Sequence, residues 1–272
     1  MKRIIGLIMI SLIVFVLSFS ALSLERINVS GSTTVLPIMQ IVAEEFMYQN
    51  PDVDITVSGG GSGVGIAALI DKIASVAMSS RKIKTEELDK AVAKGLSVQE
   101  FEIAKDAITV IVSPANTKIN QIDSQTLKQI YTGAITNWKD LSGEDKPIVV
   151  ISRDTNSGTF EVFNEHILKK DQLAPTVLML ASNRAILDEV GKNPEAIGYV
   201  GLGYVTDQVK GLLLDGVEPT KENALSGIYP ISRGLYLYTP DIPKGVTKDF
   251  IDFFFSEEGQ AIVEEEGFIR VN

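Results

Sequence analysis

Short runs of β-branched residues alternate along the chain with stretches whose apolar residues recur at helical spacing. Residues 26–30 have the composition of a strand, and a polar turn follows at residues 31–34. The next apolar residues fall at i, i+4, i+7 and i+11, as expected for one face of a helix: Val35, Met39, Val42 and Phe46. This part of the sequence predicts a strand, a loop and an amphipathic helix in that order.

The same order occurs twice more. Residues 53–57 alternate between apolar and polar, residues 59–63 are rich in glycine, and a helix face follows at Ile66, Leu69, Ile70 and Ile73. Residues 148–151 form an apolar run, residues 152–159 are polar, and a helix face follows at Phe160, Phe163, Ile167 and Leu168. Repeated strand-to-helix units predict α/β lobes with largely parallel sheets.

Two strand-like segments are candidates for crossings between lobes. They are residues 107–113, ended by Pro114, and residues 234–239, ended by Pro240. With both crossings, we expect two α/β lobes joined by a hinge and a binding cleft between them. The first lobe then comprises residues 24–110 and 232–272, and the second comprises residues 111–231.

The N-terminus has the pattern of a cleaved signal peptide. Lys2 and Arg3 precede an apolar run at residues 4–19, and small residues follow at 21–23. The run is shorter than the roughly 20 apolar residues that a membrane-spanning helix needs. We therefore predict that residues 1–23 are removed and that the protein is secreted into the periplasm.

Composition and charge exclude several kinds of binding site and binding partner. The sequence contains no cysteine, which excludes a disulfide framework, a thiolate metal site and a lipoprotein anchor. Loss of Lys2 and Arg3 takes the formal charge from −10 to −12, a balance that disfavours nucleic acid and anionic membranes. A soluble monomer is expected, and any anion that it binds must be captured locally.

The three predicted strand-to-helix loops carry small hydroxylated residues. They contain Thr33 and Thr34, then Ser62 and Gly63, then Ser157, Gly158 and Thr159. A helix N-terminus offers unpaired N–H groups to an anion, but Ser and Thr are also ordinary helix N-caps, so no single loop decides the matter. Arg153 favours the anion-binding interpretation over ordinary helix N-caps, because a guanidinium group fits a tetrahedral oxyanion and stays charged at all relevant pH values.

Catalytic, metal and nucleotide sites find little support. The one histidine, His166, has no second histidine or cysteine at a metal-ligating or triad spacing, and a surface or cap role is expected for it. The glycine run at residues 59–63 lacks the lysine of a phosphate-binding loop. The strand-rich setting of the tyrosines and Trp138 favours packing in the core and at the lobe interface over a stacking surface for sugars or bases. We expect no enzyme, no cofactor and no metal.

Several motifs together carry a family resemblance. They are Gly31 to Pro37, Gly60 to Gly63, Met78 to Arg81, Asp106 to Asn116, Ile130 to Trp138, Ser152 to Phe160 and Ala196 to Val200. In this order they resemble the phosphate-binding proteins of bacterial phosphate ABC transporters, which are type II periplasmic binding proteins. The resemblance covers nearly the whole chain after residue 23.

The resemblance implies a function and a set of ligand residues. The function is capture of inorganic phosphate in the periplasm and its delivery to a membrane permease, through closure of two lobes on the ion. The implied phosphate-binding residues are Thr33, Thr34, Ser62, Arg153, Ser157, Gly158 and Thr159. The alternative is a receptor for another tetrahedral oxyanion, namely sulfate, molybdate or tungstate.

One position departs from the family pattern. Ser80, followed by Arg81, occupies the place where some members have an aspartate that accepts the proton of the phosphate. We include Ser80 among the expected ligand residues. Selectivity against sulfate then requires another acceptor, which is Asp154, the Ser80 hydroxyl or a main-chain carbonyl, unless Asp154 serves to orient Arg153. The role of Arg81 stays open.

Overall fold

The computed structural model describes residues 24–141 and 144–271, so the predicted signal peptide lies outside the described residues. The strands are β1 (Glu25–Gly31), β2 (Val53–Ser58), β3 (Val76–Ser79), β4 (Gln99–Val112), β5 (Gln121–Ile122), β6 (Val149–Arg153), β7 (Leu178–Leu180), β8 (Ala196–Gly201), β9 (Lys210–Gly211), β10 (Leu213–Leu214) and β11 (Ser232–Thr239). The α-helices are α2 (Leu36–Gln49), α3 (Ser62–Ile70), α4 (Thr85–Ala93), α5 (Ser124–Tyr131), α6 (Gly158–Phe163), α7 (Asn183–Lys192), α8 (Lys221–Leu225), α9 (Gly245–Phe254) and α10 (Glu257–Glu265). Short helical segments lie at Trp138–Asp140, Asn164–Leu168 and Leu202–Tyr204.

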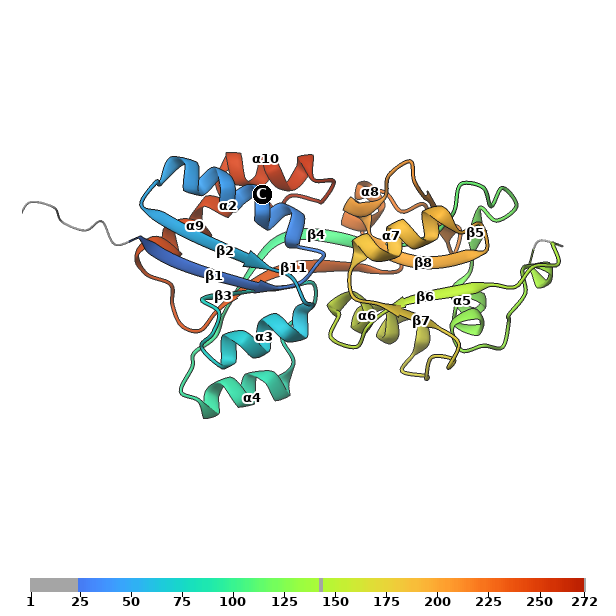
Figure 1. Ribbon diagram of the computed structural model, residues 1–272, viewed down its shortest axis with the longest axis horizontal. Coiled ribbons are helices and arrows are strands. Elements are labelled where there is room, and N and C mark those ends of the chain that lie inside the picture. The colour runs from blue at the N-terminus through green and yellow to red at the C-terminus, as the bar shows by residue number, and fades with distance from the viewer. Residues whose placement is uncertain (1–23, 142–143, 272) are drawn as a thin grey trace, which may run out of the picture.

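One curled sheet runs through both halves of the molecule. Its strand order is β2-β1-β3-β11-β4-β8-β6-β7, and β9 pairs with β4. Strand β1 is parallel to β2 and β3, and β6 is parallel to β7 and β8, as expected for strand-to-helix units. Strands β4 and β11 run between the two halves (Figure 1).

Strand β4 belongs to both halves. Its residues Gln99 to Ala107 pair with β11, whereas Ile108 to Val112 pair with β8. The predicted crossing at residues 107–113 is thus the second half of a longer strand. The other crossing lies earlier than expected, between Ile231 and Leu235, because residues 234–239 pair along the first half of β4.

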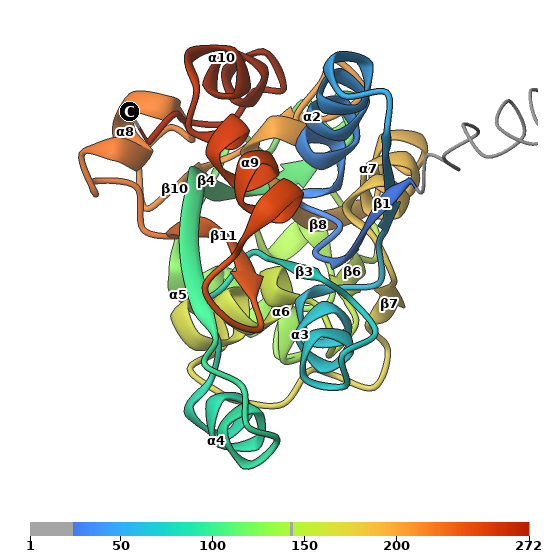
Figure 2. The same ribbon diagram turned by 90° about the vertical axis from the view of Figure 1, so that its left-hand side faces the viewer.

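Two hydrophobic cores divide at this crossing. We call the part with β1–β3, α2–α4, α9 and α10 the first lobe, and the part with β5–β10 and α5–α8 the second lobe. Ile103 and Ala104 of β4 pack in the first-lobe core, and Ala107 and Ile108 pack in the second-lobe core. In the first lobe, α2, α9 and α10 cover one face of the sheet, and α3 and α4 lie on the other (Figures 1 and 2).

Aromatic residues fill the second-lobe core, as predicted from their strand-rich setting. Phe163 stacks on Tyr199 with ring centroids 4.0 Å apart, and Tyr131 packs against both rings. Trp138 is also buried. His166 is exposed, in agreement with the predicted surface role. Among the described residues, no helix has the length and apolar character needed to cross a membrane.

Helix α3 is shorter than the apolar spacing predicts. It ends at Ile70, and Lys72 then adopts a left-handed conformation with φ of 58°. Ile73 consequently lies outside the helix and is 69% exposed. Ile73 has the sequence spacing of a helix face only by coincidence, because the helix has already ended and the chain turns at Lys72.

Helix α3 also approaches β1 closely at Gly65. A Cβ atom at this position would lie 2.4 Å from the carbonyl oxygen of Ser30 and 2.5 Å from the Cα of Gly31. Backbone atoms of a central strand cannot move aside cheaply. The glycine therefore sets how near α3, and the loop before it, lie to the sheet.

We expect Gly65→Ala to lower the free energy of unfolding by about 1–3 kcal/mol, because the added methyl group overpacks the contact with β1. Urea denaturation measures this loss. Val64→Ala is the matched control on the same helix, since Val64 is 40% exposed. Equal stability of Gly65→Ala and the control would show that the helix–strand contact tolerates a methyl group.

Candidate functional site

The hydroxyl groups of the three loops meet where the two lobes touch. Thr34 Oγ1 of the first lobe lies 3.0 Å from Thr159 Oγ1 of the second lobe. Ser62 Oγ lies 3.4 Å from Ser80 Oγ and accepts a hydrogen bond of 3.0 Å from the Ser80 N–H. All eight residues predicted for the site are buried: Thr33, Thr34, Ser62, Ser80, Arg153, Ser157, Gly158 and Thr159.

Gly158 lets the second-lobe loop come close to the serines of the first lobe. A Cβ atom at this position would lie 2.4 Å from Ser62 Oγ and 2.8 Å from Ser80 Oγ. Any larger residue would push the loop and the serines apart. Glycine at this position thus allows the lobes to approach each other across the hydroxyl cluster.

The ordinary N-cap explanation holds for one loop only. Ser157 Oγ accepts the N–H of Phe160 at 3.2 Å and caps α6. Helices α2 and α3 begin after Val35 and Gly61, and neither start has a side-chain cap. The hydroxyls of Thr34 and Ser62 are therefore buried without being used to cap a helix.

Thr33 presents an unpartnered hydroxyl. Its Oγ1 is buried and has no hydrogen-bond partner among the described residues, while its carbonyl oxygen accepts a hydrogen bond of 2.5 Å from the Tyr204 hydroxyl. Buried hydroxyl groups are normally satisfied by a partner, so an unsatisfied one at the meeting point of two lobes is a candidate ligand group.

Main-chain carbonyls orient Arg153, which is 1% exposed. Its Nε donates to Leu180 O at 3.2 Å and its Nη2 to Ala181 O at 2.9 Å, whereas Nη1 donates to no atom of the described residues. Asp154 forms no ion pair with Arg153 in the described chain, and its Oδ1 accepts the N–H of Asn156 at 2.8 Å. Burial lowers the pKa of Arg153, and the nearby charge of Arg233 acts in the same direction.

A second buried arginine, Arg233, lies in this cluster and was not among the residues predicted from the sequence. The Nη2 of Arg233 lies 2.7 Å from Asp106 Oδ2, and its Nη1 donates to Thr159 Oγ1 at 2.9 Å. Burial raises the pKa of Asp106, and the charge of Arg233 opposes this shift. One signal was available in the sequence, because Asp106 and Arg233 each directly precede one of the two segments predicted to cross between the lobes.

Asn183, at the start of α7, was also missed. Its Nδ2 donates to Thr34 Oγ1 at 2.9 Å, and the side chain is fully buried. Its Oδ1 has no partner among the described residues. No signal in the sequence pointed to this residue, since an asparagine at a helix start resembles an N-cap. The N-cap of α7 is Ser182.

The cluster is positively charged although the whole protein is negative. Arg153 and Arg233 bring two guanidinium groups, and Asp106 brings one carboxylate, which leaves one net positive charge. The described residues contain no group of three or more acidic or histidine side chains able to hold a metal ion. The arrangement suits an anion with several oxygen atoms and is unsuited to a cation.

A second set of ion pairs joins the lobes beside the cluster and involves Arg81. Arg81 Nε lies 2.6 Å from Glu161 Oε2, a charge contact without hydrogen-bond alignment, and Lys84 Nζ lies 2.9 Å from Glu161 Oε1. Within the first lobe, Arg81 Nη2 lies 2.7 Å from Glu87 Oε1. A cavity of about 450 Å³ adjoins these pairs and is lined by both lobes.

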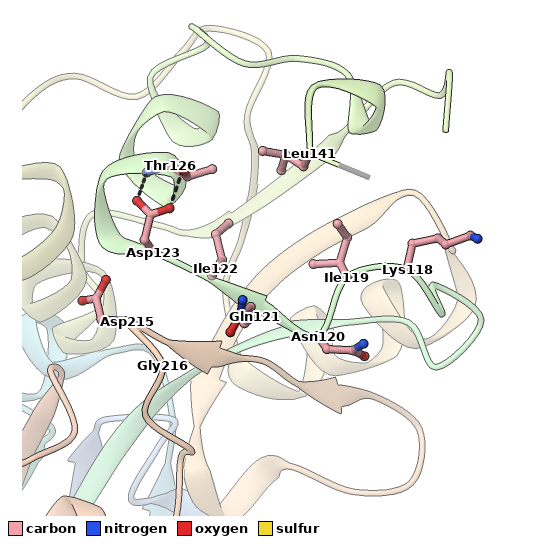
Figure 3. Close-up of a pocket in the computed structure, with 10 residues that line it drawn as sticks. All are labelled: Lys118, Ile119, Asn120, Gln121, Ile122, Asp123, Thr126, Leu141, Asp215 and Gly216. Carbon is pink, nitrogen blue, oxygen red and sulfur yellow. Dashed lines mark hydrogen bonds between the residues drawn. The ribbon is translucent and has the colours of Figure 1, made fainter. Parts of the chain in front are cut away.

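A larger cavity, of about 630 Å³, lies away from this cluster at β5 in the second lobe (Figure 3). Its carboxylates already have partners in the protein. Asp123 accepts hydrogen bonds from the N–H and hydroxyl of Thr126, and Asp215 accepts from the N–H and hydroxyl of Ser124. None of the predicted ligand residues lines it, so cavity size does not identify the site.

Comparison with known proteins identifies the family of the chain. The family described as "PBP superfamily domain" matches residues 20–258. The phosphate-binding protein PstS of Bacillus subtilis is 34% identical over 247 residues, covering 90% of this chain and 80% of the relative. PstS of Borreliella burgdorferi is 35% identical over 258 residues and 90% of both chains. The chain belongs to the PstS family of the PBP superfamily.

Solved structures of this family confirm the predicted two-lobed fold. A putative phosphate ABC transporter substrate-binding protein from Clostridium perfringens, with bound phosphate, has a TM-score of 0.85 and 38% identity, covering 91% of this chain and 100% of that one. An ABC-type phosphate transport receptor from Vibrio cholerae has a TM-score of 0.74 and 32% identity, covering 89% and 99%.

The Arg81 ion pair makes a pH-dependent contribution to stability through Glu87. Burial by itself raises the pKa of Glu87. The hydrogen bonds from the Arg81 side chain and the Lys84 N–H, together with the positive charges of Arg81 and Lys84, outweigh burial and lower this pKa below its usual value. A carboxyl group with a lowered pKa in the folded state stabilises the fold above its unfolded pKa. That contribution is lost as the pH falls through the folded value.

We therefore expect the melting temperature of the parent protein to fall more steeply below about pH 4.5 than that of Glu87→Gln, which has no carboxyl group to protonate. Calorimetric melting between pH 3 and 7 measures the difference. Glu86→Gln is the control, since Glu86 is exposed and forms no ion pair among the described residues. Parallel curves for the parent and Glu87→Gln would contradict the expectation.

Proposed function

We propose that the chain is the substrate-binding component of a phosphate ABC transporter and that it encloses one inorganic phosphate ion between its lobes. The observation that carries the proposal is the buried, donor-rich cluster with one net positive charge. The relatives' names and the phosphate bound to the C. perfringens protein support phosphate over sulfate, molybdate or tungstate.

The proposed ligand residues divide between the lobes. The first lobe contributes Thr33, Thr34, Ser62 and Ser80, and the second contributes Arg153, Ser157, Gly158 and Thr159. Three features support direct roles: the unpartnered Thr33 hydroxyl, the Nη1 of Arg153, whose hydrogen bonds to described residues come from Nε and Nη2 alone, and the close approach of Gly158 to Ser62. Ser157 acts partly as a cap, so its role would be to orient the loop.

Closure of the lobes would complete the site. The lobe limits predicted from the sequence are residues 24–110 with 232–272, and residues 111–231. The hydrophobic cores divide slightly earlier in β4, between Ala104 and Ala107, and at the start of β11, between Ile231 and Leu235, which supports a hinge at these strands. Glu161 would then help to hold the closed form through Arg81 and Lys84.

Location and partners complete the proposal. The protein is exported after cleavage of residues 1–23, works as a monomer in the periplasm and delivers phosphate to the membrane permease. It uses no cofactor or metal and catalyses no reaction. The single histidine, His166, is exposed and forms no hydrogen bond to the hydroxyls of the site among the described residues, which argues against a histidine-activated nucleophile.

Calorimetry on protein stripped of ligand by unfolding and refolding should give one phosphate site per chain. Arg153→Met should weaken binding by about 3 kcal/mol, or about 10²-fold, because the anion loses a buried cationic partner. Arg153→Lys should bind phosphate more tightly than Arg153→Met but less tightly than the parent, since lysine keeps the positive charge but cannot form the two parallel hydrogen bonds of a guanidinium group.

Melting curves check that both Arg153 variants are folded. Tight binding of molybdate or tungstate without any heat from phosphate would replace the proposal by the other oxyanion class. Turnover of phosphate esters would replace it by an enzyme. Unchanged phosphate affinity in folded Arg153→Met would remove Arg153 from the site.

We expect excess sulfate near pH 7 to displace bound phosphate poorly, although Ser80 replaces the aspartate. Phosphate and sulfate have nearly the same shape, but a buried acceptor left unpaired by sulfate can discriminate by about 10⁴-fold. Competition calorimetry on the parent, Ser80→Ala and Asp154→Asn identifies the acceptor as the residue whose loss removes selectivity. Ready displacement from the parent would identify a general oxyanion receptor.

A further inference from the structure

Arg233 uses every one of its N–H groups inside the protein. Two of them, on Nε at 2.9 Å and on Nη2 at 2.7 Å, go to Asp106 Oδ2. The others go to Thr159 Oγ1 at 2.9 Å, to Thr34 Oγ1 at 3.4 Å and to the Ser80 carbonyl oxygen at 3.4 Å. A guanidinium has five N–H donors, so none is left over for a ligand.

The two threonine hydroxyls at the lobe contact can therefore be counted completely. Together they have four lone pairs and two protons. Arg233 donates to each oxygen and Asn183 donates to Thr34 Oγ1, which fills three lone pairs. The contact of 3.0 Å between Thr34 and Thr159 fills the fourth and uses one proton.

One hydroxyl proton is left with no acceptor inside the cluster. No lone pair is free to receive a hydrogen bond from outside. The threonine pair is thus fixed as a donor, in contrast to an isolated hydroxyl, which donates or accepts according to its partner. The reason lies in Arg233 and Asn183, whose N–H groups cannot act as acceptors.

From this count we propose that Arg233, held by Asp106, is a positioning residue that directs the Thr34 proton to Thr159 and so fixes the Thr159 hydroxyl as a donor to the bound oxyanion, which makes the site favour the less protonated form of the anion. The proposal rests on the proposed phosphate-binding function. Arg233 acts through the threonines and does not itself contact the ligand.

Asp106 gives the guanidinium its orientation. Its side chain is fully buried, its Oδ2 accepts both Arg233 hydrogen bonds, and its Oδ1 accepts the N–H of Leu202 at 2.9 Å. Arg233 also lies directly opposite Asp106 across β11 and β4, so the strand register brings the pair together. Removing only one partner would leave an unpaired buried charge and destabilise the fold.

A double variant separates positioning from stability. Arg233→Met alone should lower both the melting temperature and the phosphate affinity. Asp106→Asn combined with Arg233→Met removes both charges and keeps an acceptor for Leu202, so the melting temperature should recover. The affinity of the double variant for phosphate should remain about 10- to 100-fold below the parent, the range of a hydrogen bond to a charged group.

The pH profile provides a readout that a purely structural pair would not change. In the parent, affinity for total phosphate should rise between pH 6 and 8 as the ion loses a proton, because the threonine pair cannot accept one. In the double variant a threonine hydroxyl is free to rotate and accept, so the rise should be smaller. Arg26→Met, on an exposed residue, is the control for the loss of one positive charge in Arg233→Met, with unchanged affinity and profile expected.

Parent-like affinity and pH profile in the folded double variant would overturn the proposal. If that variant melts early, Arg233→Lys is measured instead, since it keeps a charge beside Asp106 but has three N–H donors on one nitrogen in place of the five that Arg233 uses. A 10-fold or greater loss in Arg233→Lys supports the proposal, and unchanged affinity overturns it. Failure of the parent itself to bind phosphate would contradict the proposed function rather than this inference.

Discussion

A buried ion pair lies where the two strands that connect the lobes run side by side. Asp106 of β4 and Arg233 of β11 face each other in register, between the core of the first lobe and the core of the second. The cost of removing two charged groups from water is offset only if they attract each other closely and make further hydrogen bonds. Here these bonds reach Thr34 and Thr159, one from each lobe, so the same pair ties the crossing strands to the candidate site.

The candidate site is locally positive although the protein as a whole is acidic, so it can bind an anion. Over the whole chain the formal charge is −10, so long-range attraction cannot gather phosphate. Locally, two arginines outweigh one aspartate, and buried hydroxyls add donors without charge. In a buried environment each such donor interacts more strongly than it would in water. Capture is therefore a short-range property of the closed cluster, to which the ion pairs of Glu161 with Arg81 and Lys84 add a link between the lobes.

Much of the fold followed from local patterns in the sequence. The three strand-to-helix units formed as expected because alternation of apolar residues and helical spacing are short-range signals. The loops with Thr33, Ser62 and Gly158 were found because hydroxyl and glycine residues cluster between those elements. Helix α3 ended earlier than its spacing indicated, and the second crossing lay nearer to Arg233 than residues 234–239 suggested. Boundaries depend on turns and strand pairing, which periodicity does not contain.

The sequence by itself determined the secondary-structure units, the family resemblance and the small hydroxylated loops, because each is a local property of neighbouring residues. The tertiary structure decided how these loops are used. Only pairing in space brings Asn183 to Thr34, 149 residues away, and Arg233 to Asp106, 127 residues away. Only the hydrogen bonds of the folded chain distinguish the capping hydroxyl of Ser157 from the unpartnered hydroxyl of Thr33, since both are buried. Donor and acceptor counts depend on contacts between distant segments, and these exist only after the two cores have formed on a shared strand.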